Sequence, residues 1–439
     1  MKKVLSLVLC HLSLAALALA AAAAEPQTNA VSMTLAQASE RALGTDQSIA
    51  IALAETQKAK LLTWGAATRM GPQLTGNAGY TAPERDITSP TGPVLVSTKS
   101  ANISLVQPLL DLSVFAAYRA GKLTIEEARL GYRSAVRNIL FGVTQAYYDV
   151  LKQQSVVAVS EQTLRLAREQ LGLAERRYSV GVAVKTDALR ARVQAEQAHR
   201  DLIDAQNALQ LARTVLGNVL NLGADREIAV SDPPWHAPSK ETFEALEKVA
   251  FERREDFLAG KLAINEREEE HNVVRAQYGP RLVGTFSYGW IDPETQSVKN
   301  DFWNAGVAVQ MPFFTGGQRE VDLKRTTIET SEAKLRQESL EKSIQEDVRA
   351  AWLNLHALEQ SLAALRAQLD AAEENYKNLQ SQYRAGTATS LDVMTALNDL
   401  NSARKDLMTQ TYDYQIGLQN LERVTGVFQD PLVEKLKTP

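Results

Sequence analysis

The stretch YSVGVAVKTDAL, which runs from Tyr178 to Leu189, interrupts the proline-free segment 109–232. Most of that segment consists of Ala, Leu, Gln, Glu, Arg and Lys, which are strong helix formers. Glycine and β-branched residues break the helical pattern at this stretch, and a Thr-Asp pair restarts it. A similar stretch, YRAGTATSLDVM, occupies 383–394 within a second proline-free segment, 313–430. The sequence therefore predicts two long helical segments that are each broken once, in the same way.

This similarity belongs to an internal repeat that covers most of the chain. At a constant separation of 205 residues, identical residues recur through both stretches and the helices that follow them. In the first copy the recurring residues are Tyr178, Gly181, Asp187, Ala191, Ala198, Asp201, Leu202, Gln210, Leu216 and Val219. Further upstream, PQLTGNAGY at 72–80 resembles PRLVGTFSY at 280–288. The repeated unit is a helix, two strands, a long helix, a break and a second long helix.

We therefore expect a signal peptide, two structural repeats and a linker. The boundaries are 1–24 for the signal peptide, 25–232 for the first repeat, 233–241 for a Pro-rich linker and 242–439 for the second repeat. The paired strands are expected at about 72–108 and 280–312, and the long helical hairpins at about 113–222 and 318–426, with a C-terminal tail after the second. Such a repeat is too long for a solenoid, so it indicates duplication of half of the protein.

The first 24 residues have the pattern of a secretory signal peptide. Lys2 and Lys3 precede an apolar segment, and three alanines at 22–24 provide a cleavage site. An uncleaved membrane anchor is the alternative. Cys10, the single cysteine, lies inside this segment, so we expect no disulfide in the mature chain, and a lipid anchor stays open. No later segment has 18 consecutive apolar residues, so we predict no transmembrane helix.

The helical segments are unusually long. Apolar residues recur at spacings of three and four in both, which is the pattern of an amphipathic helix. The segments at about 113–177 and 318–382 each predict one helix of roughly 65 residues, on the order of 100 Å long. A helix of that length must pack against other helices along its whole length, as in a coiled coil.

The strands have one apolar and one small or polar face. Trp303, Val307 and Val309 alternate with small or polar residues, and Trp290 lies on the apolar face of the strand before. This alternation is typical of an outer-membrane barrel, with these four residues facing lipid. A half-buried antiparallel sheet in a soluble protein is the alternative. Four strands cannot close a barrel, because the smallest have about eight, and open edges are not tolerated in lipid. Several copies must then share one barrel, and three copies would supply twelve strands.

Two segments at the helix breaks resemble TolC-like outer-membrane efflux proteins. They are RRYSVGVAVKTDALRARVQAE at 176–196 and SQYRAGTATSLDVMTALNDLNSARKDL at 381–407. In both, a Gly follows a Tyr by three residues and an Asp follows the Gly by six. QPLLD at 107–111 and MPFFTGG at 311–317 are similar to the segments by which the strands of this family end. The resemblance covers essentially the whole mature chain.

The resemblance implies a mainly helical fold with a membrane β-barrel part. Long coiled-coil hairpins would form a trimeric α-barrel tunnel, continuous with a twelve-stranded β-barrel that has four strands per chain. The protein would lie in the outer membrane of a Gram-negative bacterium and span into the periplasm. As a homotrimer it would dock a periplasmic adaptor and, through it, an inner-membrane pump, and so form an exit duct. The resemblance names no cargo and no pump family.

The resemblance also assigns roles to the residues at the helix breaks. Thr186, Asp187, Tyr383 and Asp392 match positions that close the periplasmic entrance. The adaptor would bind Val180, Gly181, Val182, Ala385, Gly386 and Thr387. Two departures leave the gating open, because Ala388 stands where an arginine is frequent and Thr395 where an acidic residue is frequent.

A simpler role for several of these residues is helix capping, and the two roles are compatible. Gly181 and Gly386 would adopt the left-handed conformation that ends a helix. Thr186, or Ser390 in the second copy, would be the N-cap of the next helix. Asp187 and Asp392 would lie in the first turn, near the positive end of the helix dipole.

The sequence contains no motif that indicates catalysis or a cofactor. The histidines after the signal peptide lack the spacing of a zinc site, and REEEH at 267–271 is typical of a solvated helix face. We expect no enzyme activity, no metal and no cofactor. The formal net charge of −4 and the pI of about 5.9 argue against a nucleic-acid partner. A periplasmic coiled-coil adaptor, or a secreted structural scaffold, is the alternative to an exit duct.

Overall fold

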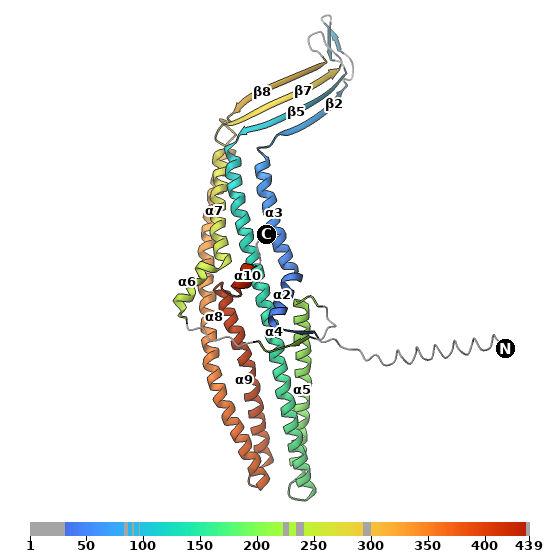
Figure 1. The fold of residues 1–439 in the computed structure, drawn as a ribbon, viewed down its shortest axis with the longest axis vertical. Helices are drawn as coiled ribbons and strands as arrows, with labels where there is room; N and C mark the ends of the chain where they lie inside the picture. The colour runs from blue at the N-terminus through green and yellow to red at the C-terminus, as the bar shows by residue number, and fades with distance from the viewer. Residues whose placement is uncertain are drawn as a thin grey trace, which may run out of the picture. The chain divides into compact units, whose positions relative to one another are not determined.

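The computed structural model describes residues 31–82, 87–89, 92–95, 97–222, 228–233, 241–292 and 300–435. The predicted signal peptide at 1–24 and the linker residues 234–240 lie outside these ranges. The fold is mainly helical (Figure 1). The helices are α2 (Leu35–Thr45), α3 (Gln47–Thr68), α4 (Leu112–Ser179), α5 (Lys185–Val219), α6 (Phe243–Arg253), α7 (Glu255–Ala276), α8 (Gln318–Ala385), α9 (Ser390–Val424) and α10 (Asp430–Lys435). The strands are β1 (Val31–Met33), β2 (Gln73–Thr81), β3 (Ile87–Ser89), β4 (Gly92–Leu95), β5 (Thr98–Leu110), β6 (Ile228–Val230), β7 (Arg281–Asp292) and β8 (Asp301–Gln310).

Corresponding helices of the two halves have equal lengths. α4 and α8 each contain 68 residues, and α5 and α9 each contain 35. α2 and α6 each contain 11 residues, and α3 and α7 each contain 22. The two long helices that the sequence predicts are therefore present, each without interruption. The helix expected before the strands is divided in both halves, at Asp46 and at Arg254.

Four strands form one antiparallel sheet in the order β2-β5-β7-β8 (Figure 1). In this register Tyr288 lies opposite both Ile103 of β5 and Trp303 of β8. Residues directly opposite each other in a ladder share a face of the sheet. One face is consequently apolar across all four strands. Its members include Leu74, Tyr80, Ile103, Leu105, Phe286, Tyr288, Trp290, Trp303, Val307 and Val309.

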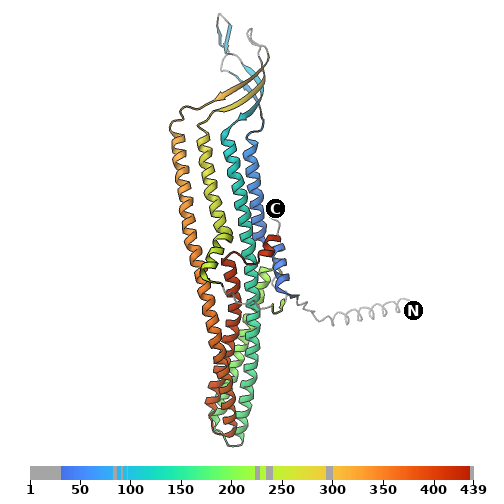
Figure 2. The same cartoon turned by 60° about the vertical axis from the view of Figure 1, so that its left-hand side comes forward.

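The chain divides into two compact units, and each unit combines parts of both halves. One comprises residues 47–137, 241–350 and 422–439, and the other 1–46, 138–240 and 351–421. In the first, α3, the start of α4, α7 and the start of α8 lie side by side in the same order as the strands that they adjoin (Figure 2). The contacts between neighbours include Thr63 Oγ1 to Gly121 O at 2.8 Å, Arg119 to Glu269 at 2.9 Å and His271 to Thr326 at 3.0 Å. No helix within the described ranges is long and apolar enough to cross a membrane.

In the second unit, parts of α4, α5, α8 and α9 enclose an apolar core. Its buried members are Leu164, Ala167, Ala195, Ala198, Tyr376, Tyr383, Val393, Ala396, Leu397 and Leu400. A parallel pair of short strands, β1 and β6, is joined to α4 by the buried Tyr147. The Tyr147 hydroxyl lies 3.0 Å from the Met33 carbonyl and 2.7 Å from the Ser231 carbonyl. The many alanines of this core allow the helices to approach closely, which long packed hairpins require.

Candidate functional site

The two helix breaks are turns of the same geometry. Gly181 has a φ of +76° and Gly386 a φ of +84°. The Val182 N–H donates to the Arg177 carbonyl at 2.9 Å, and the corresponding bond closes the turn at Gly386. This left-handed glycine with a bond back to the last helical turn is a Schellman motif. The predicted role of both glycines in ending α4 and α8 is confirmed.

The helices that follow begin differently from each other, and the predicted N-caps are wrong. α5 begins at Lys185 after Val184, whose side chain cannot cap, so Thr186 lies inside the first turn. In the second copy Thr389, and not Ser390, caps α9. Thr389 Oγ1 accepts from the Asp392 N–H at 3.2 Å, and the Asp392 carboxylate accepts from the Thr389 N–H at 2.9 Å. The hydroxyl and the backbone N–H of Thr389 lower the pKa of the Asp392 carboxyl below its usual value.

We define the first tip as residues 177–187 and the second tip as residues 382–392. Tyr383 is buried in the second tip, 3% exposed, and the Arg177 guanidinium lies 4.6 Å from the centre of its ring. Thr186 is exposed, and Asp187 is half-buried. Within the tips, all of whose residues are described, no hydrogen bond or ion pair joins Asp187 to Tyr383 or to Asp392. The predicted role of these residues in closing an entrance stays a prediction.

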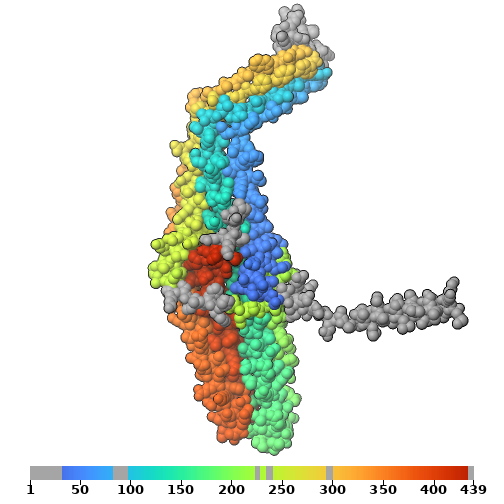
Figure 3. Space-filling view, viewed as in Figure 1, coloured from blue at the N-terminus to red at the C-terminus, as the bar shows by residue number. Residues whose placement is uncertain are grey.

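The residues predicted to bind an adaptor lie on the surface of the two turns. Val180 is 72% exposed, and Val182 is exposed beside it. The remaining predicted residues, Gly181, Ala385, Gly386 and Thr387, are exposed as well. In the view of Figure 3, the turn between α4 and α5 and the turn between α8 and α9 are uncovered. With Val184, the first tip presents three exposed valines, an apolar surface that a partner can bind.

The residues predicted to face lipid lie on one face of the sheet. Trp303, Val307 and Val309 alternate along β8, and Trp303 is 71% exposed. Trp290 shares their face, because it lies two residues after Tyr288, which pairs with Trp303. Apolar side chains exposed over several strands indicate a surface that is covered in the working protein. That lipid covers it stays a prediction.

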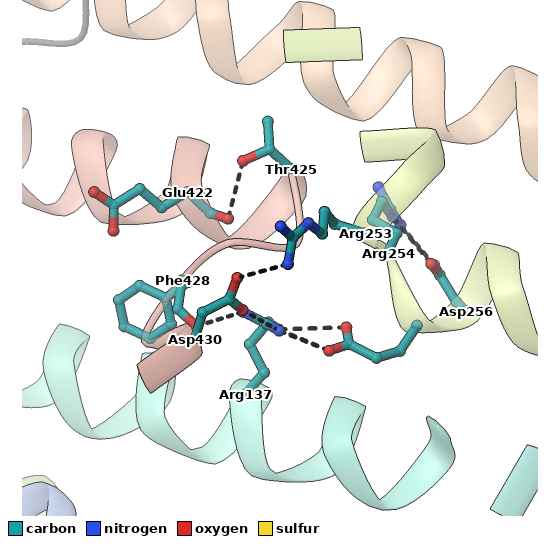
Figure 4. A network of polar contacts seen from close by, with 9 residues as sticks. Arg137, Arg253, Arg254, Asp256, Glu422, Thr425, Phe428 and Asp430 are labelled. Carbon is teal, nitrogen blue, oxygen red and sulfur yellow. Dashed lines mark hydrogen bonds and ion pairs between the residues drawn. The ribbon is translucent and has the colours of Figure 1, made fainter. Parts of the chain in front are cut away.

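A buried charged network, which no local sequence pattern indicates, holds residues 428–430 (Figure 4). Arg137 of α4 is 5% exposed and donates to the Glu255 carboxylate at 2.7 Å and to the Asp430 carboxylate at 2.8 Å. It also donates to the Phe428 carbonyl. Burial by itself lowers the pKa of Arg137, but the bonds to both carboxylates outweigh that effect and raise it. The network therefore keeps a charged arginine inside the first unit.

Gly426 lies in the turn between α9 and α10, next to this network. Its φ is +77°, and a Cβ atom there would lie 2.9 Å from backbone atoms of Arg253 and Arg254. Its counterpart in the first half, Asn221, is also left-handed, with a φ of +53°. The close backbone, more than the conformation, therefore requires glycine at Gly426.

We expect Gly426→Ala to lower the free energy of unfolding by about 1–3 kcal/mol more than Gly181→Ala does. Both glycines have nearly the same φ, so the loss due to conformation is shared, but the Gly181 site has no atom within 4 Å of the added Cβ. Thermal unfolding of the two variants, followed by circular dichroism, measures the difference. Equal midpoints would show that the backbone at Arg253 moves aside.

Arg254 is the centre of a second cluster of charged residues, next to the Arg137 network. It donates to the Asp256 carboxylate at 2.7 Å and to the Asp347 carboxylate at 3.1 Å. Burial by itself raises the pKa of the Asp256 carboxyl, but the hydrogen bond and the charge of Arg254 outweigh it and lower the pKa. The ionised form of Asp256 is thus favoured by the folded chain.

This lowered pKa predicts a loss of stability in acid. Unfolded Asp has a pKa of about 3.9, so the stabilisation is complete above about pH 5 and is lost as the pH falls through the lower, folded value. We expect the melting temperatures of the wild type and Asp256→Asn to differ at pH 7, and to converge only as the pH falls through the folded pKa of Asp256, which lies below about 3.9. Glu338→Gln, at an exposed position of α8, is the matched control and should have the melting temperature of the wild type at each pH. A constant difference between wild type and Asp256→Asn would contradict this prediction.

Within the described ranges, no group of three or more His, Cys, Asp or Glu side chains is placed to hold a metal ion. His271, the last residue of REEEH, lies with its Nδ1 3.0 Å from Thr326 Oγ1 of α8. Glu268 of the same segment pairs with Lys334 at 3.3 Å. These charged residues therefore connect α7 to α8.

Comparisons with known proteins agree with this architecture. A family model described as outer membrane efflux protein matches residues 38–222 and 246–427. The outer membrane protein TolC of Vibrio cholerae serotype O1 is 25% identical over 371 residues, which are 82% of this chain and 83% of that protein. The alkaline protease secretion protein AprF of Pseudomonas aeruginosa is 23% identical, over 76% of this chain and 71% of that protein. The crystal structure of the outer membrane protein VceC from Vibrio cholerae superimposes with a TM-score of 0.78 and 19% identity, over 89% of this chain and 96% of that one.

Proposed function

Since the chain belongs to the outer membrane efflux protein family, we propose that it is the exit duct of an efflux or secretion system. The protein resides in the outer membrane of a Gram-negative bacterium and extends into the periplasm. Members of this family are channel proteins. The substrate passes through such a duct without chemical change, so the chain needs no catalytic residue.

The observation that carries the proposal is the four-stranded sheet with one apolar face. Its outer strands, β2 and β8, have no partner strand on their free sides within the described chain. Unpaired edges are not stable in lipid, and a barrel needs about eight strands or more. Three copies supply twelve strands, so a homotrimer with a shared β-barrel satisfies both conditions. The row α3-α4-α7-α8 would close in the same way into a helical tunnel.

The tips are the proposed contact with a periplasmic adaptor and, through it, with an inner-membrane pump. Exposed residues of both turns support this assignment, above all the valines Val180, Val182 and Val184. The structural repeats at 25–232 and 242–439 would supply one tip each. The name of AprF refers to protease secretion, and the name of TolC states no cargo. Both an efflux system and a secretion system are therefore candidates for this chain.

A periplasmic adaptor or scaffold is the other candidate function. The family match covers both helical hairpins together with the strands of both halves. That the match includes the strands supports a duct, because a periplasmic adaptor does not require a sheet with an exposed apolar face.

Cell fractionation and planar-bilayer recording test the proposal together. We expect the full chain in the outer-membrane fraction, as a detergent-requiring trimer that dissociates on heating. The purified trimer should insert into bilayers and conduct ions in discrete steps. Recovery of a monomer in the osmotic-shock fluid, or a trimer that never conducts, would overturn the assignment.

A further inference from the structure

We propose that Arg177 is the residue that fastens the first tip to the second tip and so restrains opening of the duct. That Arg177 restrains opening rests on the proposed function as a duct. That Arg177 joins the two tips rests on the position of its guanidinium group. Arg177 is not among the residues that match the gate positions of the family. Its role follows from where its guanidinium group lies.

One side chain of the first tip makes two contacts with the second tip and lies close to its glycine turn. The Arg177 guanidinium lies 4.6 Å from the centre of the Tyr383 ring, within the range of a cation–π interaction. One of its nitrogens donates to the Tyr383 carbonyl, which also accepts from the Gly386 N–H at 3.1 Å. A Cβ at Gly386 would lie 3.8 Å from Nη2 of the same guanidinium. Arg177 therefore contacts the ring and the carbonyl of Tyr383 and lies beside the glycine turn at the end of α8.

The internal repeat provides a comparison within the molecule. The counterpart of Arg177 in the second tip is Gln382, and the counterpart of Tyr383 in the first tip is Tyr178. Tyr178 is 45% exposed, whereas Tyr383 is 3% exposed. Two copies of one turn thus differ where the cross-tip contact is made. A role common to both turns, such as helix capping, would not require this difference.

Arg176 shows what an arginine does here without a cross-tip contact. Both arginines lie in the last turn of α4, where a cation is favoured by the helix dipole. The Arg176 guanidinium lies beside Gly172 of its own helix, 3.5 Å from a Cβ built there, and Arg176 is exposed. Interaction with the dipole is therefore available to Arg176 and Arg177 alike, but of these two side chains only that of Arg177 donates a hydrogen bond to the second tip.

Arg177 contacts the ring and the carbonyl of Tyr383. The Tyr383 hydroxyl is buried and has no hydrogen-bond partner among the described residues. Tyr383→Phe keeps both groups that Arg177 contacts, whereas Tyr383→Leu removes the ring. If the tips separate, Arg177 must leave an aromatic face and a backbone acceptor and be hydrated instead.

Single-channel recording of the full trimer in planar bilayers tests the inference. We expect Arg177→Ala and Tyr383→Leu each to raise the open fraction about tenfold. The double variant should exceed neither single variant by much, because both remove one interaction. Arg176→Ala, the matched control, should conduct like the wild type. Trimer content is checked for each variant on unheated gels, so that misassembly is not taken for opening.

Two results would overturn the inference. One is an Arg177→Ala trimer that conducts like the wild type. The other is an Arg176→Ala trimer that opens as much as Arg177→Ala does, because the loss of a cation at the end of α4 would then explain both effects. Either result leaves a conducting wild-type trimer, so the proposed function survives it. A wild-type trimer that never conducts would instead refute the proposed function.

Discussion

Arg137→Ala is expected to lower the free energy of unfolding by about 3–5 kcal/mol. Arg137 donates to the carboxylates of Glu255 and Asp430 and to the Phe428 carbonyl. Removal of the guanidinium leaves the Glu255 carboxylate, 8% exposed, buried without its cation. A buried charge without a partner is much less stable than either the intact pair or an apolar replacement of both residues.

Chemical unfolding and limited proteolysis measure this effect. Because Arg137 holds Phe428 and Asp430, the Ala variant should be cleaved faster after residue 424 than the wild type. Arg119→Ala is the matched control on the same helix. Arg119 pairs with Glu269 at 2.9 Å, but its side chain is 56% exposed, so its loss should change stability far less than the loss of Arg137. Equal effects of the two substitutions would show that burial does not decide the strength of these pairs.

This network marks the limit of what the sequence predicts. The partners Glu255 and Asp430 lie 118 and 293 residues from Arg137. No local pattern relates residues at such separations, and an arginine within an amphipathic helix is most often exposed. The long helices, by contrast, follow from composition and period alone, which are properties of neighbouring residues.

At the tips, too, the features set by neighbouring residues could be predicted, and the contact between distant residues could not. Gly181 and Gly386 were predicted as helix ends because glycine readily adopts the left-handed conformation, and both have a positive φ. The N-caps lie one or two residues before the predicted positions, because Val184 precedes α5 although its side chain cannot cap, and Thr389 caps α9. The contact of Arg177 with Tyr383 was missed, since it depends on two hairpins that meet. The repeat contained a signal for it, because Arg177 corresponds to Gln382.

The strands were easier to predict where both faces had a clear character. β7 and β8 show strict alternation, and their predicted faces agree with the register of the ladder. β5, at Thr98–Leu110, ends slightly beyond the predicted limit of about 108. The short pair β3 and β4 was not predicted, because its residues 87–89 and 92–95 contain too few positions for a period.

Val307→Arg is expected to reduce assembly into the outer membrane strongly. Val307 lies in the middle of β8 on the apolar face and is exposed. An arginine that faces lipid near the middle of a barrel strand costs about 2–4 kcal/mol. In the proposed trimer this cost would arise once in each chain. The expected result is fewer heat-dissociable trimers in the outer-membrane fraction at equal expression.

Asn304→Arg is the matched control for this substitution. Asn304 lies on the same strand, three residues from Val307 and therefore on the opposite face of the sheet. In the proposed barrel that face borders the aqueous interior, where a charge is tolerated and changes ion selectivity instead. Asn304→Arg should assemble like the wild type and shift the cation-to-anion permeability ratio toward anions. If both variants assemble equally well, the apolar face does not meet lipid, and a protein partner must cover it.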